Sequence, residues 1–293
     1  MGRYTLYELE KLTGILAATI RVWERRYKIL KPKRTDTNRR WYDDDDLRRL
    51  INISVMYHSG IKISKIAAFS DSELEEKVEF LSRESNGSDK HINSLIIAML
   101  SFNGNAVNEI LLRSIISNGF EETFYNVIFP FLKRVGIMWH TGSGNIGGEH
   151  FITNIFRARL ISAIESLPPA KHPKSRRVIM FLPENELHEM GLLFYSYLIR
   201  KMGHEVLYLG QATPFYALVE VNEKWNSDVL FTGALSDISI PEPQEYLARL
   251  SSAFKSQIIL VSGSLADEPS IKEFNNIHII RTVTDLKKHI NQI

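Results

Sequence analysis

The sequence contains no cysteine, no long apolar run and little excess of charge of either sign. Without cysteine, disulfides, thiolate zinc sites and cysteine nucleophiles are excluded, so a metal ion would need histidine, carboxylates or a cofactor that supplies its own ligands. No apolar stretch is long enough to span a membrane, and the first residues do not form a signal peptide. We therefore expect a cytoplasmic protein without a membrane partner.

Length and hydrophobic content predict a folded chain of several domains. The 293 residues suffice for two or three domains, and a hydrophobic fraction of 44% excludes global disorder. The net charge of +2 does not by itself indicate a nucleic-acid partner, but the charge is unevenly distributed. Residues 21–40 hold nine lysines and arginines against two acidic residues, which is typical of a local DNA-contacting surface.

The N-terminal quarter of the chain is predicted to be helical, apart from one basic interruption. Thr5 is placed to cap a first helix, with Glu8 three residues later to close the capping box. A second helix over residues 17–27 makes a helix-turn-helix, whose second helix suits the DNA major groove. Residues 30–42 are interpreted as a basic wing, and the aspartates from Asp43 onward begin another helix. The alternative is that these charges only form the solvated face of a small bundle.

This pattern resembles the MerR-type winged-helix DNA-binding domain. The similarity lies in residues 19–27, in Pro32 and in the run from Arg39 to Tyr42, and the domain is assigned to residues 1–81. The resemblance implies a two-fold symmetric double-stranded operator as partner. The residues that it assigns to DNA are Arg21, Arg25, Arg26, Arg34, Arg39, Arg40 and Tyr42. Because relatives that sense metals do so through cysteines, this chain must answer to another signal.

The middle of the chain, residues 91–168, is predicted to form a four-helix bundle. Apolar residues recur there at helical spacing in four stretches with short connections. The polar stretch 82–90, which contains glycine and no large apolar residue, is interpreted as a linker before the bundle. Residues 168–173, with three prolines, are predicted to be an extended linker after it.

From residue 175 to residue 293, short apolar strands alternate with helices. The strands are expected near residues 178–182, 205–209, 228–232, 257–262 and 277–281. This alternation predicts a Rossmann-like, doubly wound α/β domain, with a parallel sheet and helices on both faces. Ligands of such sheets bind at the carboxyl ends of the strands, where the strand order reverses. His188, Ser236 and Gly263 follow the first, third and fourth strands, so all three are expected at that edge.

The loop after the first predicted strand carries a metal-ligand pattern, Glu186, His188 and Gly191. The carboxylate can fix the tautomer of the imidazole and raise its basicity, and the glycine lets a bulky ligand approach the backbone closely. Taken alone, the pattern has an alternative of equal weight, because a surface loop can hold a histidine by chance. Its position at the ligand edge of the sheet favours a ligand site.

These residues, together with Ser236 and the pair Ser262–Gly263, resemble the cobalamin-binding domain of the methionine synthase and methylmalonyl-CoA mutase type. The resemblance implies that His188 displaces the dimethylbenzimidazole base and binds cobalt from below. Glu186 or Ser236 would then fix its ring. Two residues depart from the pattern. Glu186 stands where aspartate is common, and Ser262 replaces the first glycine, so that a side chain takes up space beside the nucleotide tail.

In the predicted bundle, Trp139 is separated by nine residues from Glu149 and His150. Taken singly, these are a core tryptophan, a helix-starting glutamate and a surface histidine, but the glycine-rich loop over residues 141–145 favours a function. The motif is similar to the Trp-X9-Glu-His cap of the CarH/LitR-type photoreceptor repressors. That family combines the same three modules in the same order, so the resemblance spans the whole chain.

The resemblance implies that adenosylcobalamin is the chromophore and that the bundle covers its upper face. The residues that it assigns to this face are Trp139, His140, Ile146, Glu149 and His150. After light breaks the cobalt–carbon bond, His140 would take the vacant axial position opposite His188. We therefore expect a light-dependent transcriptional repressor without enzymatic activity. It would bind its operator in the dark as a homo-oligomer, from dimer to tetramer, exclude RNA polymerase from the promoter, and release DNA in the light.

Three alternatives remain open. A sensor of vitamin level would answer to any cobalamin, although a bulky cap such as Trp139 is unnecessary for that task. An enzyme of the methyltransferase or mutase type would need a further domain to hold its substrate. A regulator that has lost its cofactor is hinted at only by Ser262.

Overall fold

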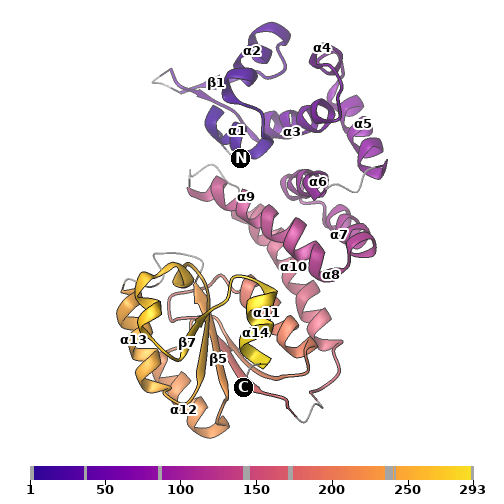
Figure 1. Cartoon of the computed structure of the whole chain (residues 1–293). Helices are drawn as coiled ribbons and strands as arrows, with labels where there is room; N and C mark the ends of the chain where they lie inside the picture. The colour runs from indigo at the N-terminus through magenta and orange to yellow at the C-terminus, as the bar shows by residue number, and fades with distance from the viewer. Residues whose placement is uncertain are drawn as a thin grey trace. The chain divides into compact units, whose positions relative to one another are not determined.

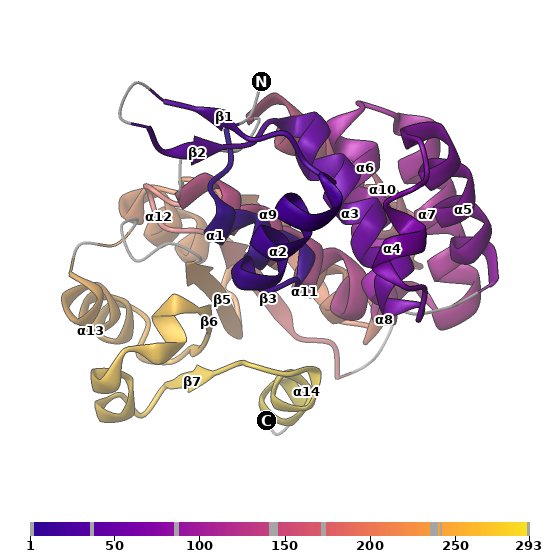
Figure 2. The ribbon, with the colours of Figure 1, turned by 90° about the horizontal axis from the view of Figure 1, so that it is seen from above.

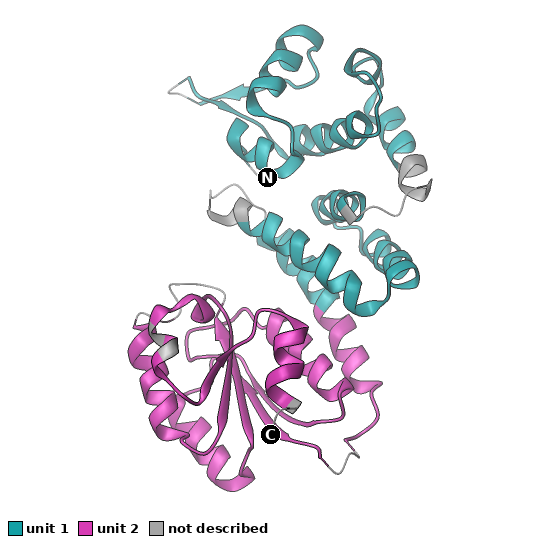
Figure 3. Ribbon diagram, viewed as in Figure 1, with its two compact units in different colours: residues 1–156 teal, residues 157–293 magenta. Residues whose placement is uncertain are grey.

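The computed structural model describes residues 3–35, 38–84, 88–140, 146–170, 174–234, 240 and 242–291, with the backbone alone at residues 79–84, 88, 137–140, 270, 272 and 291. The chain divides into two compact units, residues 1–156 and residues 157–293 (Figure 3). The division falls inside one helix, α10 (Ile146–Glu165), which contributes residues to both units.

The first unit begins with a helix-turn-helix and a short hairpin (Figures 1 and 2). The elements are α1 (Leu6–Thr13), α2 (Ala17–Tyr27), β1 (Lys33–Arg34), β2 (Arg40–Trp41), α3 (Asp44–His58), α4 (Ile63–Ile66) and α5 (Asp71–Glu84). Thr5 and Glu8 make both hydrogen bonds of the predicted capping box, and Gly14 ends α1 in the left-handed conformation. Asp43 caps α3 in the same way, through a capping box with Asp46. The predicted starts of these helices are therefore confirmed.

The segment 82–90, predicted to be a linker, is helical at residues 82–84 and 88–90, and residues 85–87 lie outside the described residues. Helix α5 continues to Glu84, and the next helix, α6, begins at Ser88. Polar composition does not prevent this, because α5 is anchored by its buried residues Leu74 and Val78. Asp89 in the first turn of α6 is also favourable at a helix N-terminus.

The bundle of the first unit is built from four long helical stretches. Its elements are α6 (Ser88–Leu100), α7 (Gly104–Asn118), α8 (Phe120–Thr123), the π-helix η1 (Phe124–Ile128), α9 (Phe129–His140) and the first half of α10. The segments α8, η1 and α9 follow one another without a break from Phe120 to His140. Its core includes Phe131 and Phe156, whose rings meet edge to face with centroids 5.6 Å apart. The helical content predicted for this region is confirmed, whereas the π-helix was not predicted.

The second unit is a five-stranded parallel sheet with helices on both faces (Figures 1 and 2). The strands are β3 (Arg177–Phe181), β4 (Glu205–Gly210), β5 (Val229–Ala234), β6 (Ile258–Gly263) and β7 (Ile277–Ile279). The helices are α11 (Met190–Lys201), α12 (Phe215–Trp225), α13 (Pro243–Ala253), α14 (Val283–Asn291) and the 3-10 turns η2 (Ser264–Asp267) and η3 (Pro269–Glu273). All neighbouring strands pair in parallel, so the predicted doubly wound sheet is confirmed.

Alternating apolar residues explain why this sheet is covered on both sides. Ile179, Leu230 and Ile259 face the core that also contains residues of α12 and α13. Phe231, the next residue on β5, instead packs against Tyr195 on α11, with ring centroids 4.8 Å apart. The strand order is β4-β3-β5-β6-β7, so β4 is added on one side of β3 and β5 on the other. The order of the strands, but not their direction, therefore reverses between β3 and β5. Ligands of such sheets bind beside this reversal, at the carboxyl end, which here is the loop after β3.

Candidate functional site

The loop between β3 and α11 brings His188 and Glu186 together. Glu186 is almost fully buried, whereas the His188 side chain is 60% exposed. Oε1 of Glu186 accepts the backbone N–H of His188 at 2.9 Å and lies 2.6 Å from Nδ1 of the same ring. One carboxylate oxygen therefore holds both the backbone and the side chain of His188.

This pairing decides the chemistry of the imidazole. Because a carboxylate accepts a hydrogen bond, Nδ1 carries the proton, and the neutral ring then has its lone pair on Nε2. A group of three or more side chains able to hold a metal ion by themselves is absent from the described part of the chain. A single imidazole suits a metal ion whose other ligands come from a cofactor, and a cobalt corrinoid is such a group.

The other residues predicted for this edge lie at the ends of β5 and β6. Ser236 falls outside the described residues, two positions after the end of β5. Gly263 has a φ of +70°, and a Cβ there would lie 1.9 Å from the carbonyl oxygen of Ala234. Ser262 pairs with Gly233 on β5, and a Cβ at Gly233 would lie 2.6 Å from the Ser262 hydroxyl. The Ser262 side chain thus occupies space that the neighbouring glycine leaves open.

Gly191 differs from Gly263 because neither its backbone conformation nor its surroundings require glycine. It is the second residue of α11, and a Cβ at this position would meet no atom within 4 Å. Open space beside the His188 loop is what a bulky ligand would require.

A further set of residues in this loop was missed by sequence reasoning. Glu189, next to His188, is buried and accepts hydrogen bonds from Nε of Arg157 at 2.6 Å and from the Tyr208 hydroxyl at 2.9 Å. Burial, and then the charge of Glu189, raise the pKa of Tyr208, so that its hydroxyl stays protonated. The adjacency of Glu189 to His188 was visible in the sequence, but its partners are 32 and 19 residues away.

The residues predicted to cover the cofactor lie at the end of α9 and the start of α10. Trp139 and His140 are the last two residues of α9, and their side chains, like the whole loop 141–145, lie outside the described residues. Ile146, the first residue of α10, is exposed. Glu149 and His150 follow one turn later, with Oε2 and Nδ1 3.3 Å apart. Their predicted contacts with a cofactor stay predictions.

The DNA-contacting residues predicted on α2 share one face of that helix. Arg21, Arg25 and Arg26 are exposed, whereas Ile20 and Trp23 are buried on the opposite face against the rest of the domain. This distribution leaves three cationic side chains available to a groove.

In the hairpin, Arg34 and Arg40 pair across the two strands, and Arg39 precedes the second strand. All three are exposed. Nη1 of Arg34 donates to the side chain of Asn38 at 2.6 Å, and Arg40 lies 3.4 Å from Glu24. Their position is compatible with the predicted wing, and their contacts with DNA stay predictions.

The prediction for Tyr42 requires a correction. Its side chain is fully buried, and its hydroxyl donates to Glu24 of α2 at 2.7 Å. A backbone bridge from Tyr42 to Tyr4 also joins the hairpin to the start of the domain. Tyr42 therefore fixes the hairpin onto α2 and does not present its hydroxyl to a phosphate.

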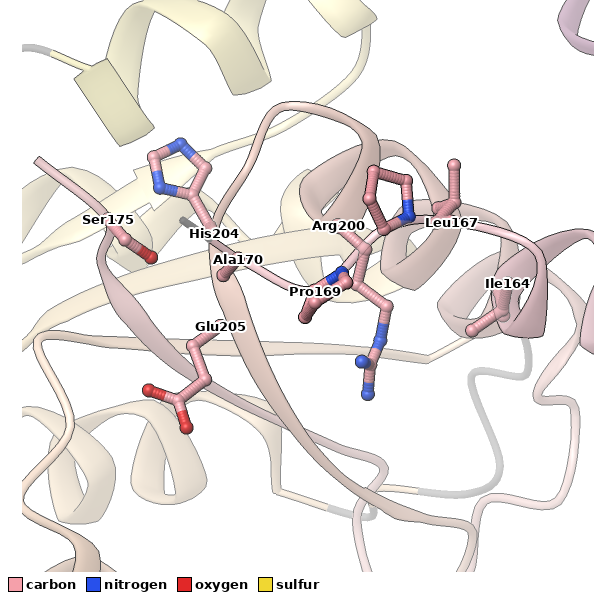
Figure 4. A pocket seen from close by; sticks show the side chains of 9 residues that line it. Ile164, Leu167, Pro169, Ala170, Ser175, Arg200, His204 and Glu205 are labelled. Atoms are coloured by element: carbon pink, nitrogen blue, oxygen red, sulfur yellow. The ribbon is translucent and has the colours of Figure 1, made fainter. Parts of the chain in front are cut away.

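A cavity of about 430 Å³ in the second unit lies away from the His188 loop. It is lined by Ile164, residues 167–170, Ser175, Arg200, His204 and Glu205 (Figure 4). These residues surround the amino ends of β3 and β4, whereas His188 follows the carboxyl end of β3. The cavity is thus separate from the candidate ligand site.

No helix within the described ranges is both long enough and apolar enough to cross a membrane.

Comparison with known proteins shows two family matches and several relatives of this chain. Residues 4–73 match the family described as "MerR HTH family regulatory protein", and residues 91–162 match the family described as "B12 binding domain". The chain is 27% identical over 294 residues to "HTH-type transcriptional repressor CarH" of Myxococcus xanthus, with 96% of each chain covered. It is 25% identical over 249 residues to "HTH-type transcriptional repressor CarA" of the same organism, covering 84% of this chain and 81% of that one.

Among solved structures, the fold is similar to that of the monomethylamine corrinoid protein of Methanosarcina barkeri. The TM-score is 0.54 at 14% identity, over 71% of this chain and 100% of that chain. At this identity the likeness concerns the fold alone. The full-length relatives and the two matching families, in the order found here, confirm the resemblance seen in the sequence to CarH-type regulators, which combine a MerR-type DNA-binding domain with a B12 binding domain.

Proposed function

We propose that this chain is a light-dependent transcriptional repressor that binds adenosylcobalamin as its chromophore. The observation that carries the proposal is the pairing of His188 with the buried carboxylate of Glu186 at the ligand edge of the sheet, 2.6 Å apart. The regulatory part is supported by the MerR match over residues 4–73 and by the relatives named as repressors.

In the proposed complex, His188 would hold the cobalt of the cofactor through Nε2. Glu186 keeps the ring in the required tautomer and increases its electron donation. The donor set fits, because a corrinoid ring fills four ligand positions of cobalt and leaves the protein to supply an axial base. Gly191 leaves room for the ring beside the loop. When bound, adenosylcobalamin supplies a cobalt–carbon bond that light breaks.

The upper face is proposed to be covered by the residues around the α9–α10 connection. Trp139 would pack against the adenosyl group, and Glu149 and His150 would hydrogen-bond it. The 3.3 Å contact between these last two side chains supports their acting as one polar pair. Ile146 would line the same space. His140 would be a second imidazole able to hold the cobalt when the adenosyl group is absent.

The DNA-binding part of the proposal rests on the arginine face of α2 and on the hairpin. Three exposed arginines at helical spacing suit a major groove, and Arg39 and Arg40 suit the phosphate backbone. One such domain binds weakly, whereas several domains tethered in a dark-state dimer or tetramer gain avidity for a two-fold symmetric operator. Occupation of the promoter would exclude RNA polymerase.

Absorption spectra of the purified full-length chain with adenosylcobalamin test the cofactor proposal. We expect the parent spectrum to change irreversibly on green illumination. His188→Ala should lose the spectral signature of imidazole ligation, and Glu186→Gln should weaken it. His58→Ala is a matched control, because this ring lies on α3 with Nδ1 2.8 Å from the carbonyl oxygen of Ser54.

Each outcome distinguishes the candidate functions. A holoprotein spectrum that does not change on green illumination would contradict the photoreceptor and leave a sensor of vitamin level. Equal operator binding in the dark with adenosyl- and methylcobalamin would support that sensor. An identical spectrum for His188→Ala and for the parent would contradict axial ligation by His188.

A further inference from the structure

Glu189 is a buried carboxylate next to His188, the proposed cobalt ligand. The proposed cofactor chemistry does not use Glu189. Each of its two oxygens has a separate donor. Oε1 accepts from Nε of Arg157 on α10 at 2.6 Å, and Oε2 accepts from the Tyr208 hydroxyl on β4 at 2.9 Å. Because a buried carboxylate without partners is strongly unfavourable, this arrangement fixes Glu189 relative to two other elements.

The residues on the other side of His188 are anchored to the same neighbouring segment. The backbone N–H of Ala212 donates to the carbonyl oxygen of Glu186 at 3.2 Å. The side chain of Gln211 donates to the carbonyl oxygen of Leu187. His188 therefore lies between residues that are held by the end of β4 and by the loop after it.

The packing around Glu189 leaves little freedom. Gly210 has a φ of +81°, and a Cβ there would lie 3.3 Å from the Tyr208 ring and 3.8 Å from Oε2 of Glu189. The backbone of β4 thus approaches both side chains closely. Glu189 is also the residue that precedes α11, and its carbonyl oxygen accepts the N–H of Leu193. A shift of Glu189 would move the start of that helix together with His188.

Arg157 gives this arrangement a link to α10. It follows Glu149 by eight residues on one continuous helix, which corresponds to about 12 Å along the axis. The Arg157 side chain is half exposed, while the carboxylate that it contacts is buried. Its guanidinium therefore reaches inward from α10 to the His188 loop.

We propose that Arg157, Glu189 and Tyr208 form a clamp that holds the His188 loop in position for cobalt ligation. Through Arg157, the conformational order of this loop depends on α10. The three are positioning residues. They act on the loop backbone, whereas Glu186 acts on the imidazole itself. The inference rests on the proposed role of His188, and it adds a path by which a change at the start of α10 reaches the lower ligand.

Hydrogen exchange of the full-length apoprotein, followed by mass spectrometry, tests the clamp without any cofactor. Tyr208→Phe and Arg157→Met should each accelerate exchange of the amides of residues 186–190 by about tenfold, because each leaves one carboxylate oxygen without its donor. Arg157→Lys keeps the charge and should restore part of the protection. Matched controls are Tyr197→Phe, a buried tyrosine of α11, and Arg159→Met, an exposed arginine of α10.

The same variants are then titrated with hydroxocobalamin, and imidazole ligation is followed by its absorption. We expect the apparent affinity of the His188-ligated form to fall about tenfold in Tyr208→Phe and Arg157→Met, with both controls like the parent. Exchange equal to that of the controls overturns the clamp. So does faster exchange with unchanged ligation, because the loop would then not need this order.

The failure of the proposed function has a different signature. If His188→Ala has the same cobalamin spectrum as the parent, axial ligation by His188 is wrong. The exchange measurement still judges whether the three residues hold the loop, because it is made on the apoprotein.

Discussion

Two glycines at the ligand edge of the sheet differ in whether the local backbone requires glycine. Gly263 has a left-handed backbone, and an added Cβ would collide with the carbonyl oxygen of Ala234, whereas Gly191 borders open space in helical backbone. We predict that Gly263→Ala lowers the free energy of unfolding by at least about 2 kcal/mol, because strain and a backbone clash add. Gly191→Ala should leave stability within about 1 kcal/mol, since alanine is favoured in a helix.

Urea unfolding of both apoprotein variants measures this difference, and cobalamin titration completes the comparison. If Gly191 is needed for the approach of the corrinoid, Gly191→Ala weakens cobalamin binding while the fold stays intact. A stable Gly191→Ala protein with the affinity of the parent would show that this glycine is not part of the ligand site.

Substitution of Tyr42 should lower the stability of the domain, whereas substitution of Arg39, three residues earlier, should change DNA binding. The Tyr42 hydroxyl is buried on Glu24, and burial followed by that hydrogen bond raises its pKa. Tyr42→Phe should therefore cost about 1–2 kcal/mol of stability and leave the salt dependence of DNA binding unchanged. Arg39→Ala should keep the stability and reduce the slope of log affinity against log salt by about 1. A reduced salt slope for Tyr42→Phe would contradict the buried position.

At the scale of elements, the contact between β7 and α14 predicts a pH dependence of stability. The rings of His278 and His289 are stacked with centroids 4.5 Å apart. Burial lowers the pKa of His278, and the charges of His289 and Lys288 lower it further. Burial and the charge of Lys288 also lower the pKa of His289, whereas Asp285 raises it. The unfolded chain therefore binds protons more readily, and stability should fall as the pH drops below about 6.5.

Thermal unfolding of the full-length chain between pH 7.5 and pH 5.5 checks this sign. We expect His289→Gln to flatten the decrease, because only one ring then remains to be protonated. His150→Gln serves as a control on an exposed histidine of α10. The same decrease in His289→Gln as in the parent would rule out the stacked pair as its cause.

Sequence patterns identified most elements because the signals were local. The capping residues Thr5 and Asp43 fixed helix starts, and the apolar runs around Val178, Leu230 and Leu260 marked buried parallel strands. The helical end of α5 at residues 82–84 was not predicted, because the buried apolar residues of this helix, Leu74 and Val78, lie before the polar segment. The π-helix η1 had no local signal in the sequence.

The candidate site shows the same division between local and distant signals. Glu186 and His188 are two residues apart, so their contact was accessible to sequence reasoning. The clamp on Glu189 depends on Arg157, 32 residues before it, and Tyr208, 19 residues after it, which only the folded chain brings together. Tyr42 was misassigned because an aromatic residue at the end of a basic wing has the same sequence pattern whether it is buried or exposed.

For the whole molecule, the central claim is that one cofactor links the two ends of the chain. A DNA-binding domain matches over residues 4–73, and the imidazole proposed to hold cobalt lies more than a hundred residues later, in the second unit. The link requires the cofactor to change the assembly of the protein, because avidity for an operator depends on how many DNA-binding domains are tethered.

Size-exclusion chromatography of the protein with adenosylcobalamin, in the dark and after green light, tests this claim most directly. Absorbance is recorded at cobalamin wavelengths together with protein, and His188→Ala is run beside the parent. The account predicts co-elution as a dark oligomer that becomes smaller on illumination, with no such species for His188→Ala. An elution volume that is the same in the dark and in the light, or elution of the protein without cobalamin, would contradict it.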